Sequence, residues 1–213
     1  MAMRRLELDD SDLVDALRAG RTGAMEVLYE RYSVHVQKVL VRVLGIDPVI
    51  PELLHDVFIE AFTHINAIKD SSKLKGWLTS IAVFSARGYI RKRTRSLGFW
   101  FGETSELPEV ATLGSDYDVR EALRCIYLIL DRLPTDERIA FALRFIEGME
   151  LTEVADASRV SLATIKRRLS RAQKKFVNRA MRYPALQEWI DRSERWRGMS
   201  TQGIDRRTSS VDT

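Results

Sequence analysis

The segment over residues 151–176 constrains the fold of this chain most, because it carries the signals of two consecutive helices separated by a short turn. Thr152 is suited to cap a short first helix, whose first turn carries Glu153. Ser161 is suited to cap a longer second helix. The apolar residues of this second helix recur at spacings that place them on one face: Leu162, Ile165, Leu169, Ala172 and Phe176. The segment therefore predicts a helix-turn-helix.

The second helix of this unit also has a basic face, made by Lys166, Arg167, Arg168, Arg171, Lys174 and Lys175. A charged stripe of this kind is often only the solvated side of a surface helix. The two caps and the short first helix favour instead a helix that enters the DNA major groove, with its first residues at base edges and its later ones at phosphates. The candidate DNA-contacting residues are Ala163, Thr164, Lys166, Arg167, Arg168, Arg171 and Lys174.

The whole chain has room for two small domains, because it holds 213 residues of which 45% are hydrophobic. Its net charge of +4 is only mildly basic, so nucleic-acid binding must rest on where the charge lies. The single cysteine, Cys125, lies in an apolar run typical of a buried residue, and it indicates a reducing compartment. The start, MAMRRLELDD, turns acidic instead of entering an apolar stretch, and no later run approaches the ~18 apolar residues of a membrane span. We therefore expect a soluble, cytoplasmic protein without membrane insertion.

The N-terminal half predicts a helical domain over residues 9–95. Ser11 is suited to cap a short helix that Gly20 ends, and a long helix follows from near Thr22 to Gly45. Pro51 is suited to the first turn of a third helix. The expected buried face of this third helix consists of Leu54, Phe58, Ala61, Phe62 and Ile65.

The other face of this third helix combines apolar and acidic residues, namely Leu53, Asp56, Val57 and Glu60. It fits a docking surface for another protein, and a solvated face with stray apolar residues is the alternative. Glu60 and His64 lie one turn apart but lack a third and fourth ligand at usable spacing, so we expect no metal site. The sequence also lacks the patterns of a catalytic constellation or a phosphate loop, so we expect no catalytic residue and no cofactor.

A fourth predicted helix begins near Lys73 and carries Trp77, Leu78 and Ile81 on one face. Its end is basic and includes aromatic residues, a combination that suits unpaired nucleic acid because guanidinium groups hold phosphates and rings stack on bases. The alternative places the aromatic residues in the core, and we favour it for Trp77. The candidate nucleic-acid residues are Phe84, Arg87, Arg91, Lys92, Arg93 and Arg95.

The remaining chain predicts a flexible acidic linker and a second helical domain. Residues 96–118 contain breaking glycines, a proline and several carboxylates, as linkers do. The second domain spans residues 119–182, with one helix closed by Pro134 and another that carries Asp136 and Glu137 in its first turn and stops at Gly148. Residues 183–213 form a C-terminal extension that we expect to be partly disordered. The predicted fold class is all-α, with two small domains and a helix-turn-helix at the end of the second.

The order of these segments resembles the sigma factors of bacterial RNA polymerase, specifically the extracytoplasmic-function (ECF) group of the sigma-70 family. The resemblance covers about residues 9–178. It rests on LVDALRAG and LYERY near the start, HDVFIEAF in the third predicted helix, and GWLTSIA before the basic cluster. It also rests on LPTDERIAFALRFIEGMELTEVA, which leads into SLATIKRRLSRAQKKF.

This resemblance implies a subunit that catalyses nothing itself and directs core RNA polymerase to promoter DNA. It implies that residues 51–65 dock on the polymerase through Leu53, Asp56, Val57 and Glu60. It also implies that residues 77–95 read and open the downstream promoter element and that residues 162–176 read the upstream element. An anti-sigma factor is a further partner that the resemblance implies.

The chain departs from the family pattern at two places. Val83 and Phe84 stand where Arg and Asn are common, and Gly88 stands where Asp is common, so we expect weak base preference in the downstream element. Ser158 and Arg159 replace the usual Leu-Gly of the turn. A non-glycine residue in such a turn costs roughly 1 kcal/mol if its φ is positive.

Two other functional classes use some of the same features. A helix-turn-helix regulator that binds operator DNA as a dimer accounts for residues 151–176 but leaves the docking-like face and the second basic cluster unexplained. An RNA-binding or protein-interaction module uses the basic clusters but needs no helix-turn-helix.

Overall fold

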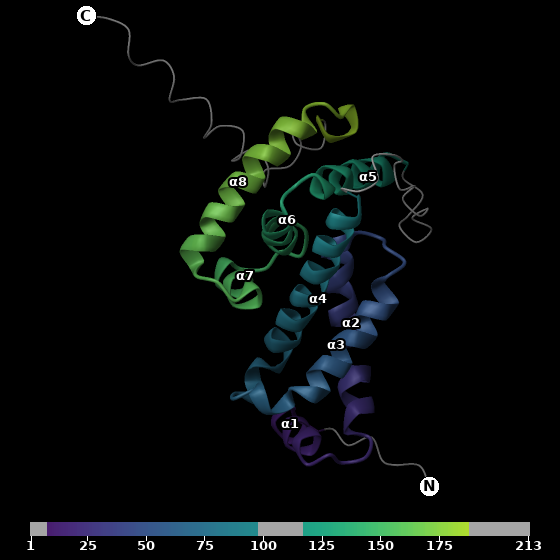
Figure 1. Ribbon diagram of the computed structural model, residues 1–213, viewed down its shortest axis with the longest axis vertical. Coiled ribbons are helices and arrows are strands. Elements are labelled where there is room, and N and C mark those ends of the chain that lie inside the picture. Colours follow the sequence, from purple (N-terminus) through teal and green to yellow (C-terminus); the bar gives the residue numbers. More distant parts are fainter. Residues whose placement is uncertain (1–7, 98–116, 188–213) are drawn as a thin grey trace, which may run out of the picture.

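The structure, a computed structural model, describes residues 8–97 and 117–187, and within these ranges the chain is helical and forms no strand (Figure 1). The predicted all-α class is therefore confirmed for this part of the molecule. Most of the expected linker and most of the C-terminal extension lie outside the described residues. None of the described helices combines the length and apolarity that crossing a membrane requires.

The N-terminal half consists of α1 (Asp10–Arg18), α2 (Ala24–Leu44), α3 (Ile50–Thr63) and α4 (Leu74–Leu97). The long helices α2, α3 and α4 pack against one another, and α1 closes one end of this bundle (Figure 1). Pro51 lies in the first turn of α3, as predicted. The bundle core is made of the apolar stripes of these helices, including Leu28, Leu40, Val43, Leu78 and Ala82.

The start of α1 differs from the sequence prediction. The cap of α1 is Asp9 and not Ser11, because the Asp9 carboxylate accepts a hydrogen bond from the amide of Asp12 at 2.8 Å. An aspartate also suits the positive end of the helix dipole. The long helix starts at Ala24, near Thr22 as predicted, and follows Gly23, whose φ of 87° only glycine adopts readily.

The C-terminal half consists of α5 (Tyr117–Asp131), α6 (Thr135–Phe141), α7 (Leu151–Ser158) and α8 (Leu162–Ala180). A π-helical turn (Ala142–Ile146) continues α6 and leads to Gly148, whose φ of 85° ends it. Helix α6 packs along α8, and the rings of Phe141 and Phe176 stack there with centroids 4.6 Å apart. The helices α7 and α8 form the predicted helix-turn-helix.

The two halves pack directly against each other, which the sequence did not predict. Helix α4 contacts both α6 and α7, so that α6 lies between α4 and α8 (Figure 1). One continuous apolar core includes residues of α1 to α4 together with Ile139, Leu143, Val154 and Ile165 of the C-terminal half. The described part of the molecule is therefore a closed arrangement of both halves.

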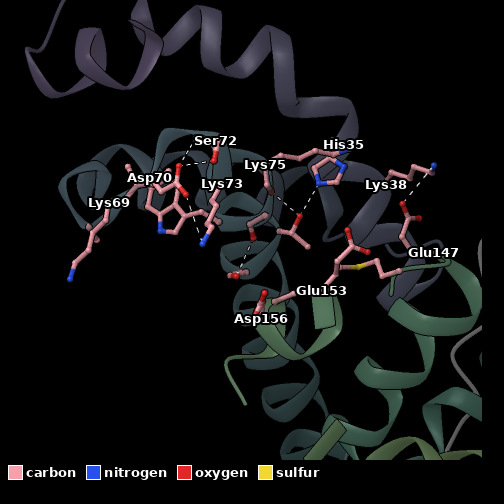
Figure 2. Close-up of a pocket in the computed structure, with 18 of the residues that line it drawn as sticks. His35, Lys38, Lys69, Asp70, Ser72, Lys73, Lys75, Glu147, Glu153 and Asp156 are labelled. Carbon is pink, nitrogen blue, oxygen red and sulfur yellow. Dashed lines mark hydrogen bonds and ion pairs between the residues drawn. The ribbon is translucent and has the colours of Figure 1, made fainter. Parts of the chain in front are cut away.

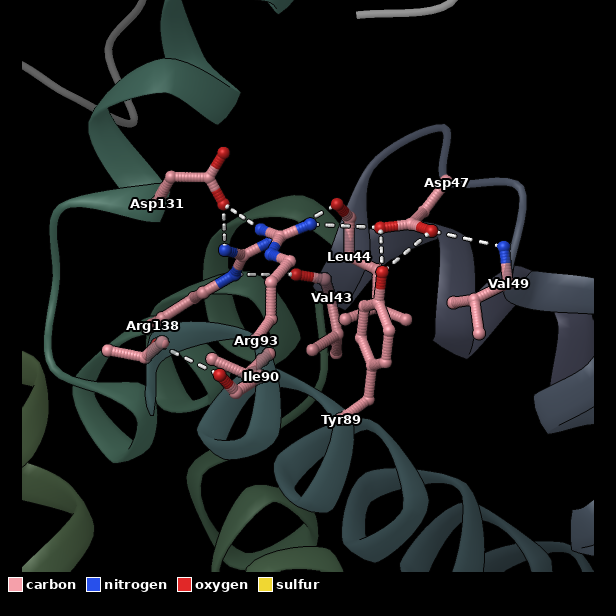
Figure 3. A network of polar contacts seen from close by, with 10 residues as sticks. Val43, Leu44, Asp47, Val49, Tyr89, Ile90, Arg93, Asp131 and Arg138 are labelled. Atoms are coloured by element: carbon pink, nitrogen blue, oxygen red, sulfur yellow. Dashed lines mark hydrogen bonds and ion pairs between the residues drawn. The ribbon is translucent and has the colours of Figure 1, made fainter. Parts of the chain in front are cut away.

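Polar contacts join the halves beside this core (Figure 3). The fully buried Arg138 of α6 donates to the main-chain carbonyls of Val43 and Leu44, which end α2, at 3.0 and 3.1 Å. Burial lowers the pKa of the Arg138 guanidinium, and the contact with Asp131 acts in the opposite direction. Arg93 of α4 bridges Asp47 at 2.9 Å and Asp131 at 2.6 Å. These arginines fix the C-terminal half against the ends of α2 and α4.

Candidate nucleic-acid interface

The first helix of the helix-turn-helix is capped by Glu150 and not by the predicted Thr152. The Glu150 side chain accepts from a main-chain amide in the first turn, and the Glu153 carboxylate accepts from the Glu150 amide at 2.8 Å. This reciprocal pair is a capping box with Glu in the place usually taken by Ser or Thr. The predicted apolar face is confirmed, since Val154, Ala155 and Ala157 are buried.

The second helix, α8, begins as predicted, with the Ser161 hydroxyl accepting from the amide of Thr164 at 3.3 Å. Its apolar face is buried at Ile165, Leu169, Ala172 and Phe176, whereas Leu162 is exposed. The opposite face leaves a row of candidate contacts in solvent: Ala163, Lys166, Arg167, Arg171 and Lys174. Thr164 is half-buried beside them, and its hydroxyl accepts from Arg167 at 3.3 Å.

Two basic residues of α8 are held by acidic residues of α6 and do not belong to this open row. Arg168 donates to Asp136 at 2.9 Å, and Lys175 donates to Glu137 at 2.7 Å. Both carboxylates come from the first turn of α6, where the sequence placed them as helix-dipole partners. Arg168 therefore braces α8 against α6 in this arrangement, although the sequence grouped it with the DNA-contacting residues.

The turn between α7 and α8 places Arg159 in the left-handed region, with a φ of 52°. Among the described residues it is the one non-glycine with a positive φ. Such a conformation costs an arginine roughly 1 kcal/mol relative to a glycine. Its guanidinium lies over the ring of Phe84 at 5.0 Å from the centroid, so the strained turn contacts α4.

The basic end of α4 and the second helix of the helix-turn-helix meet at Asp136 of α6. The Nε atom of Arg87 lies 3.0 Å from one oxygen of this carboxylate, and Arg91 lies 3.7 Å from the other. Arg168 of α8 contacts the same carboxylate. Burial lowers the pKa of the Arg87 guanidinium, and Asp136 partly offsets this effect. The two predicted basic surfaces therefore share one acidic partner.

The remaining basic residues of α4 differ in their exposure. Arg93 is occupied by Asp47 and Asp131, which makes it a contact between the halves in this arrangement (Figure 3). Lys92 and Arg95 lie on the exposed surface of the helix. Composition alone selected these basic residues as nucleic-acid candidates. Composition does not show which arginines a carboxylate holds in the folded protein.

Phe84 is 41% exposed, and two guanidinium groups lie close to its ring, those of Arg87 at 4.8 Å and Arg159 at 5.0 Å from the ring centroid. The core alternative for this ring is therefore wrong. Its neighbour Val83 is fully buried and cannot contact a nucleic-acid base. No atom lies within 4 Å of the position that a side chain at Gly88 would occupy, so α4 is open there.

The predicted docking face of α3 is wrong for two of its four residues. Leu53 and Val57 are buried, because α3 turns this side toward α2 and α4, whereas Asp56 and Glu60 are exposed. Phe62, predicted to be buried, is exposed. The apolar stripe of α3 is thus wider than the predicted one and rotated around the helix axis.

The exposed face of α3 includes Ile59, which the sequence analysis missed. Its side chain is 49% exposed and lines a groove of about 540 Å³ together with Asp56, Glu60 and Phe84. Arg159 of the helix-turn-helix also lines this groove. Ile59 and Glu60 follow Asp56 by three and four residues, and this helical spacing is the signal that could have identified the face.

A larger cavity of about 870 Å³ lies between α2, the start of α4 and α7 (Figure 2). Lys69, Lys73 and Lys75 line it on one side, and Glu153 and Asp156 of α7 line it on the other (Figure 2). Asp70 lies among these lysines, 3.8 Å from Lys73, so basic and acidic side chains of both halves line the same cavity.

His35 lines the same cavity and shares a hydrogen bond of 2.8 Å with the hydroxyl of Thr79. Burial lowers the pKa of His35 below 6.5, and the nearby Lys75 lowers it further. The imidazole is therefore neutral at physiological pH.

The metal alternative gains no support from the described residues, which bring no three potential ligands together. His64 instead lies 3.2 Å from the Glu60 carboxylate on the same helix. Cys125 is buried as predicted, and burial followed by the nearby Glu121 raises the pKa of its thiol to about 11. Such a thiol is unreactive at neutral pH.

Two protein families match the chain, one in each half. Sigma-70 region 2 matches residues 28–96, and Sigma-70, region 4 matches residues 123–176. Together they cover α2 to α4 and the helix-turn-helix with the helices that support it.

Curated relatives match over most of their length. The ECF RNA polymerase sigma-E factor of Haemophilus influenzae is 27% identical over 182 residues, which is 81% of this chain and 96% of the relative. The ECF RNA polymerase sigma factor SigX of Bacillus subtilis is 29% identical over 189 residues, covering 86% of this chain and 96% of the relative.

Solved structures share the fold. CnrH, in complex with the cytosolic domain of CnrY, aligns with a TM-score of 0.54 and 22% identity over 79% of this chain and 95% of that one. RpoE of Bartonella quintana, in complex with the anti-sigma factor NepR, aligns with a TM-score of 0.56 and 19% identity over 76% of this chain and 99% of that one. Both matching families, the relatives along the chain and the shared helical fold lead to one conclusion: the chain belongs to the sigma-70 family of RNA polymerase sigma factors, in its ECF group.

Proposed function

We propose that this protein binds core RNA polymerase and directs it to promoters, with residues 9–95 and 119–182 acting as two functional domains. The observation that carries the proposal is that one chain presents two basic surfaces, on α8 and α4, and a separate acidic and apolar face on α3. A dissociable specificity subunit needs all three, because it must hold the polymerase and contact DNA at two places. The subunit performs no catalysis itself and acts where the polymerase does, in the cytoplasm.

The exposed row on α8 is proposed to read the upstream promoter element. Ala163, Thr164, Lys166 and Arg167 lie in the first turns of the helix, where a recognition helix meets base edges. Arg171 and Lys174 lie further along the exposed face and suit phosphates. Arg168 joins them only after it leaves Asp136.

The end of α4 is proposed to hold and open the downstream element. The Phe84 ring offers a stacking face for an unpaired base, and the arginines around it offer partners for phosphates. Arg91, Lys92 and Arg95 lie on the exposed side of the helix. Arg87 and Arg93 contribute once their carboxylate partners in the other half move away.

The polymerase contact is proposed to use Asp56, Ile59 and Glu60 on the exposed side of α3. An apolar side chain between two carboxylates suits a partner surface that is itself apolar and basic. Leu53 and Val57 support this face from inside the bundle.

An anti-sigma factor is proposed as a further partner, because the two aligned structures are complexes, one of which names its partner an anti-sigma factor. The cavity between α2, α4 and α7 combines groups of both halves, so a protein bound there would hold them together. This surface is distinct from the exposed row on α8.

A transcription assay with purified core polymerase tests the proposed function. Addition of the full-length protein should start transcripts at specific positions on a library of genomic promoter fragments, and core polymerase alone should not. A dimeric helix-turn-helix regulator would instead block transcription or leave it unchanged, and it would bind DNA in the absence of polymerase. Either of those results would contradict the proposal.

A further inference from the structure

We infer that Arg159 is a latch that holds this sigma factor in a self-inhibited closed state. In this state the turn of the helix-turn-helix covers the surfaces of α3 and α4 that polymerase and promoter DNA require. This inference goes beyond the proposed function. Only the claim that the closed state is inactive rests on that function, whereas the contact of Arg159 between the two halves does not.

The first observation concerns the position of Arg159. The turn holds this residue in the left-handed region, where glycine is the usual occupant, and aims its guanidinium at the ring of Phe84. Arg87 approaches the same ring, so one cation from each half contacts the aromatic side chain. These guanidinium groups compete with a base for the face of the ring.

The second observation concerns the groove beside α3. Arg159 lines this groove together with Asp56, Ile59 and Glu60, which are the residues proposed to contact the polymerase. The other titratable groups that line the groove are Asp56 and Glu60, so the positive guanidinium lies beside two carboxylates. The turn therefore occupies the place of a basic partner surface.

The third observation is the sharing of Asp136 among Arg87 and Arg91 of α4 and Arg168 of α8. A carboxylate in this position satisfies guanidinium groups as a DNA phosphate does. It lies in a cleft of about 420 Å³ that Phe84, Arg159 and Arg168 also line. The closed state thus neutralises part of the surface that DNA would otherwise contact.

These contacts are suited to opening. The ion pairs at Asp136 and the aromatic contact of Arg159 are partly exposed, and such interactions weaken as salt screens them. Polymerase and DNA each compete for one side of the junction. Binding of either partner would therefore favour the open state through its differential affinity.

Distance measurement on the full-length chain tests the latch without polymerase or DNA. Nitroxide labels are placed on cysteines introduced at two exposed sites, Glu30 of α2 and Asn178 of α8, and electron paramagnetic resonance measures the separation. The buried native Cys125, with its thiol pKa of about 11, stays unlabelled at pH 7. The labelled protein that retains Arg159 should give one short, narrow distance population in dilute buffer. A long-distance population should grow as the salt concentration is raised.

Arg159→Gly and Arg159→Asn are the informative variants, because both residues accept a positive φ and both lack the guanidinium. At a salt concentration where the parent chain shows both populations, each variant should raise the ratio of open to closed molecules about threefold, as expected for loss of one cation–π contact. The melting temperature should stay within a few degrees, because the turn geometry is retained. Arg21→Asn, which removes an exposed guanidinium from the turn after α1, is the matched control and should leave the distances unchanged.

Unchanged distances in both Arg159 variants would overturn the latch, as would a long, broad distribution in the parent chain. Opening accompanied by a large loss of helical circular dichroism would assign Arg159 a purely structural role and also overturn it. Failure of the proposed function has a different signature: no variant would then bind core polymerase, although the distance shift would persist.

Discussion

The Nε atom of Arg138 donates to the main-chain carbonyl of Val43 at 3.0 Å, so that a side chain of α6 completes the hydrogen bonding at the end of α2. The terminal carbonyls of a helix have no partner within the helix. Water satisfies them at an exposed end, but Arg138 and Val43 are both buried. The C-terminal half therefore supplies hydrogen-bond donors for the terminal carbonyls of α2.

Arg138→Leu should destabilise the protein by about 3 kcal/mol, because it leaves the carbonyls of Val43 and Leu44 buried and unpaired. Urea unfolding followed by circular dichroism measures the change. Arg132→Leu, at an exposed position of the turn before α6, is the control and should stay within about 0.5 kcal/mol of the parent. Equal stabilities of the two variants would show that the contact contributes little.

Asp56→Arg should weaken binding to core polymerase by about tenfold or more while leaving the fold intact, because it reverses a charge on the exposed side of α3. Fluorescence anisotropy of labelled protein with core polymerase measures the affinity. Glu30→Arg makes the same charge change on an exposed site of α2 and should bind normally. Normal binding by Asp56→Arg would remove α3 from the proposed interface.

Substitutions along α8 should separate base reading from phosphate binding. Arg171→Ala and Lys174→Ala should weaken upstream-element binding on every sequence and lower the salt slope by about one. Lys166→Ala and Arg167→Ala should also change which base is preferred at one position, at a cost of ~1–3 kcal/mol. Binding isotherms on a set of single-base variants at several salt concentrations distinguish the two patterns, and uniform effects of all four substitutions would mean that α8 does not read sequence.

Phe84→Ala should impair opening of duplex promoters, because the ring offers base stacking worth ~1–3 kcal/mol. Permanganate reactivity of unpaired thymines measures the opening. Templates already mismatched in the downstream element should largely rescue the variant, since the cost of unpairing is then absent. A strict single-base requirement that persists in Phe84→Ala would contradict a stacking role.

Stability should fall as the pH is lowered below about 6.5, the ordinary pKa of histidine. Burial lowers the pKa of His35 in the folded protein, so below 6.5 the unfolded chain takes up a proton that the folded one resists. Lys75 and Lys38 act in the same direction, and Glu147 opposes them. Melting temperatures between pH 8 and pH 5 test this, and His35→Gln should flatten the part of the pH dependence that His35 causes.

The sequence by itself determined the helices, their order and the helix-turn-helix, because apolar spacing and capping act locally. Ser161, Pro51 and Gly148 have the roles that their chemistry predicts. Where several polar residues compete for one cap, local rules were insufficient: Asp9 and Glu150 took the places expected for Ser11 and Thr152. Only hydrogen bonds formed in the folded turn decide between such neighbours.

Tertiary packing decided which face of α3 is exposed to solvent and which arginines are held by carboxylates. Leu53 and Val57 are buried because α3 lies against both α2 and α4, a relationship that no single helix encodes. Arg87, Arg93 and Arg168 look like solvent-facing arginines in the sequence, but carboxylates far away in the chain hold them. Spacing along a helix fixes which residues share a face, whereas the partner that covers that face is fixed only when distant helices pack.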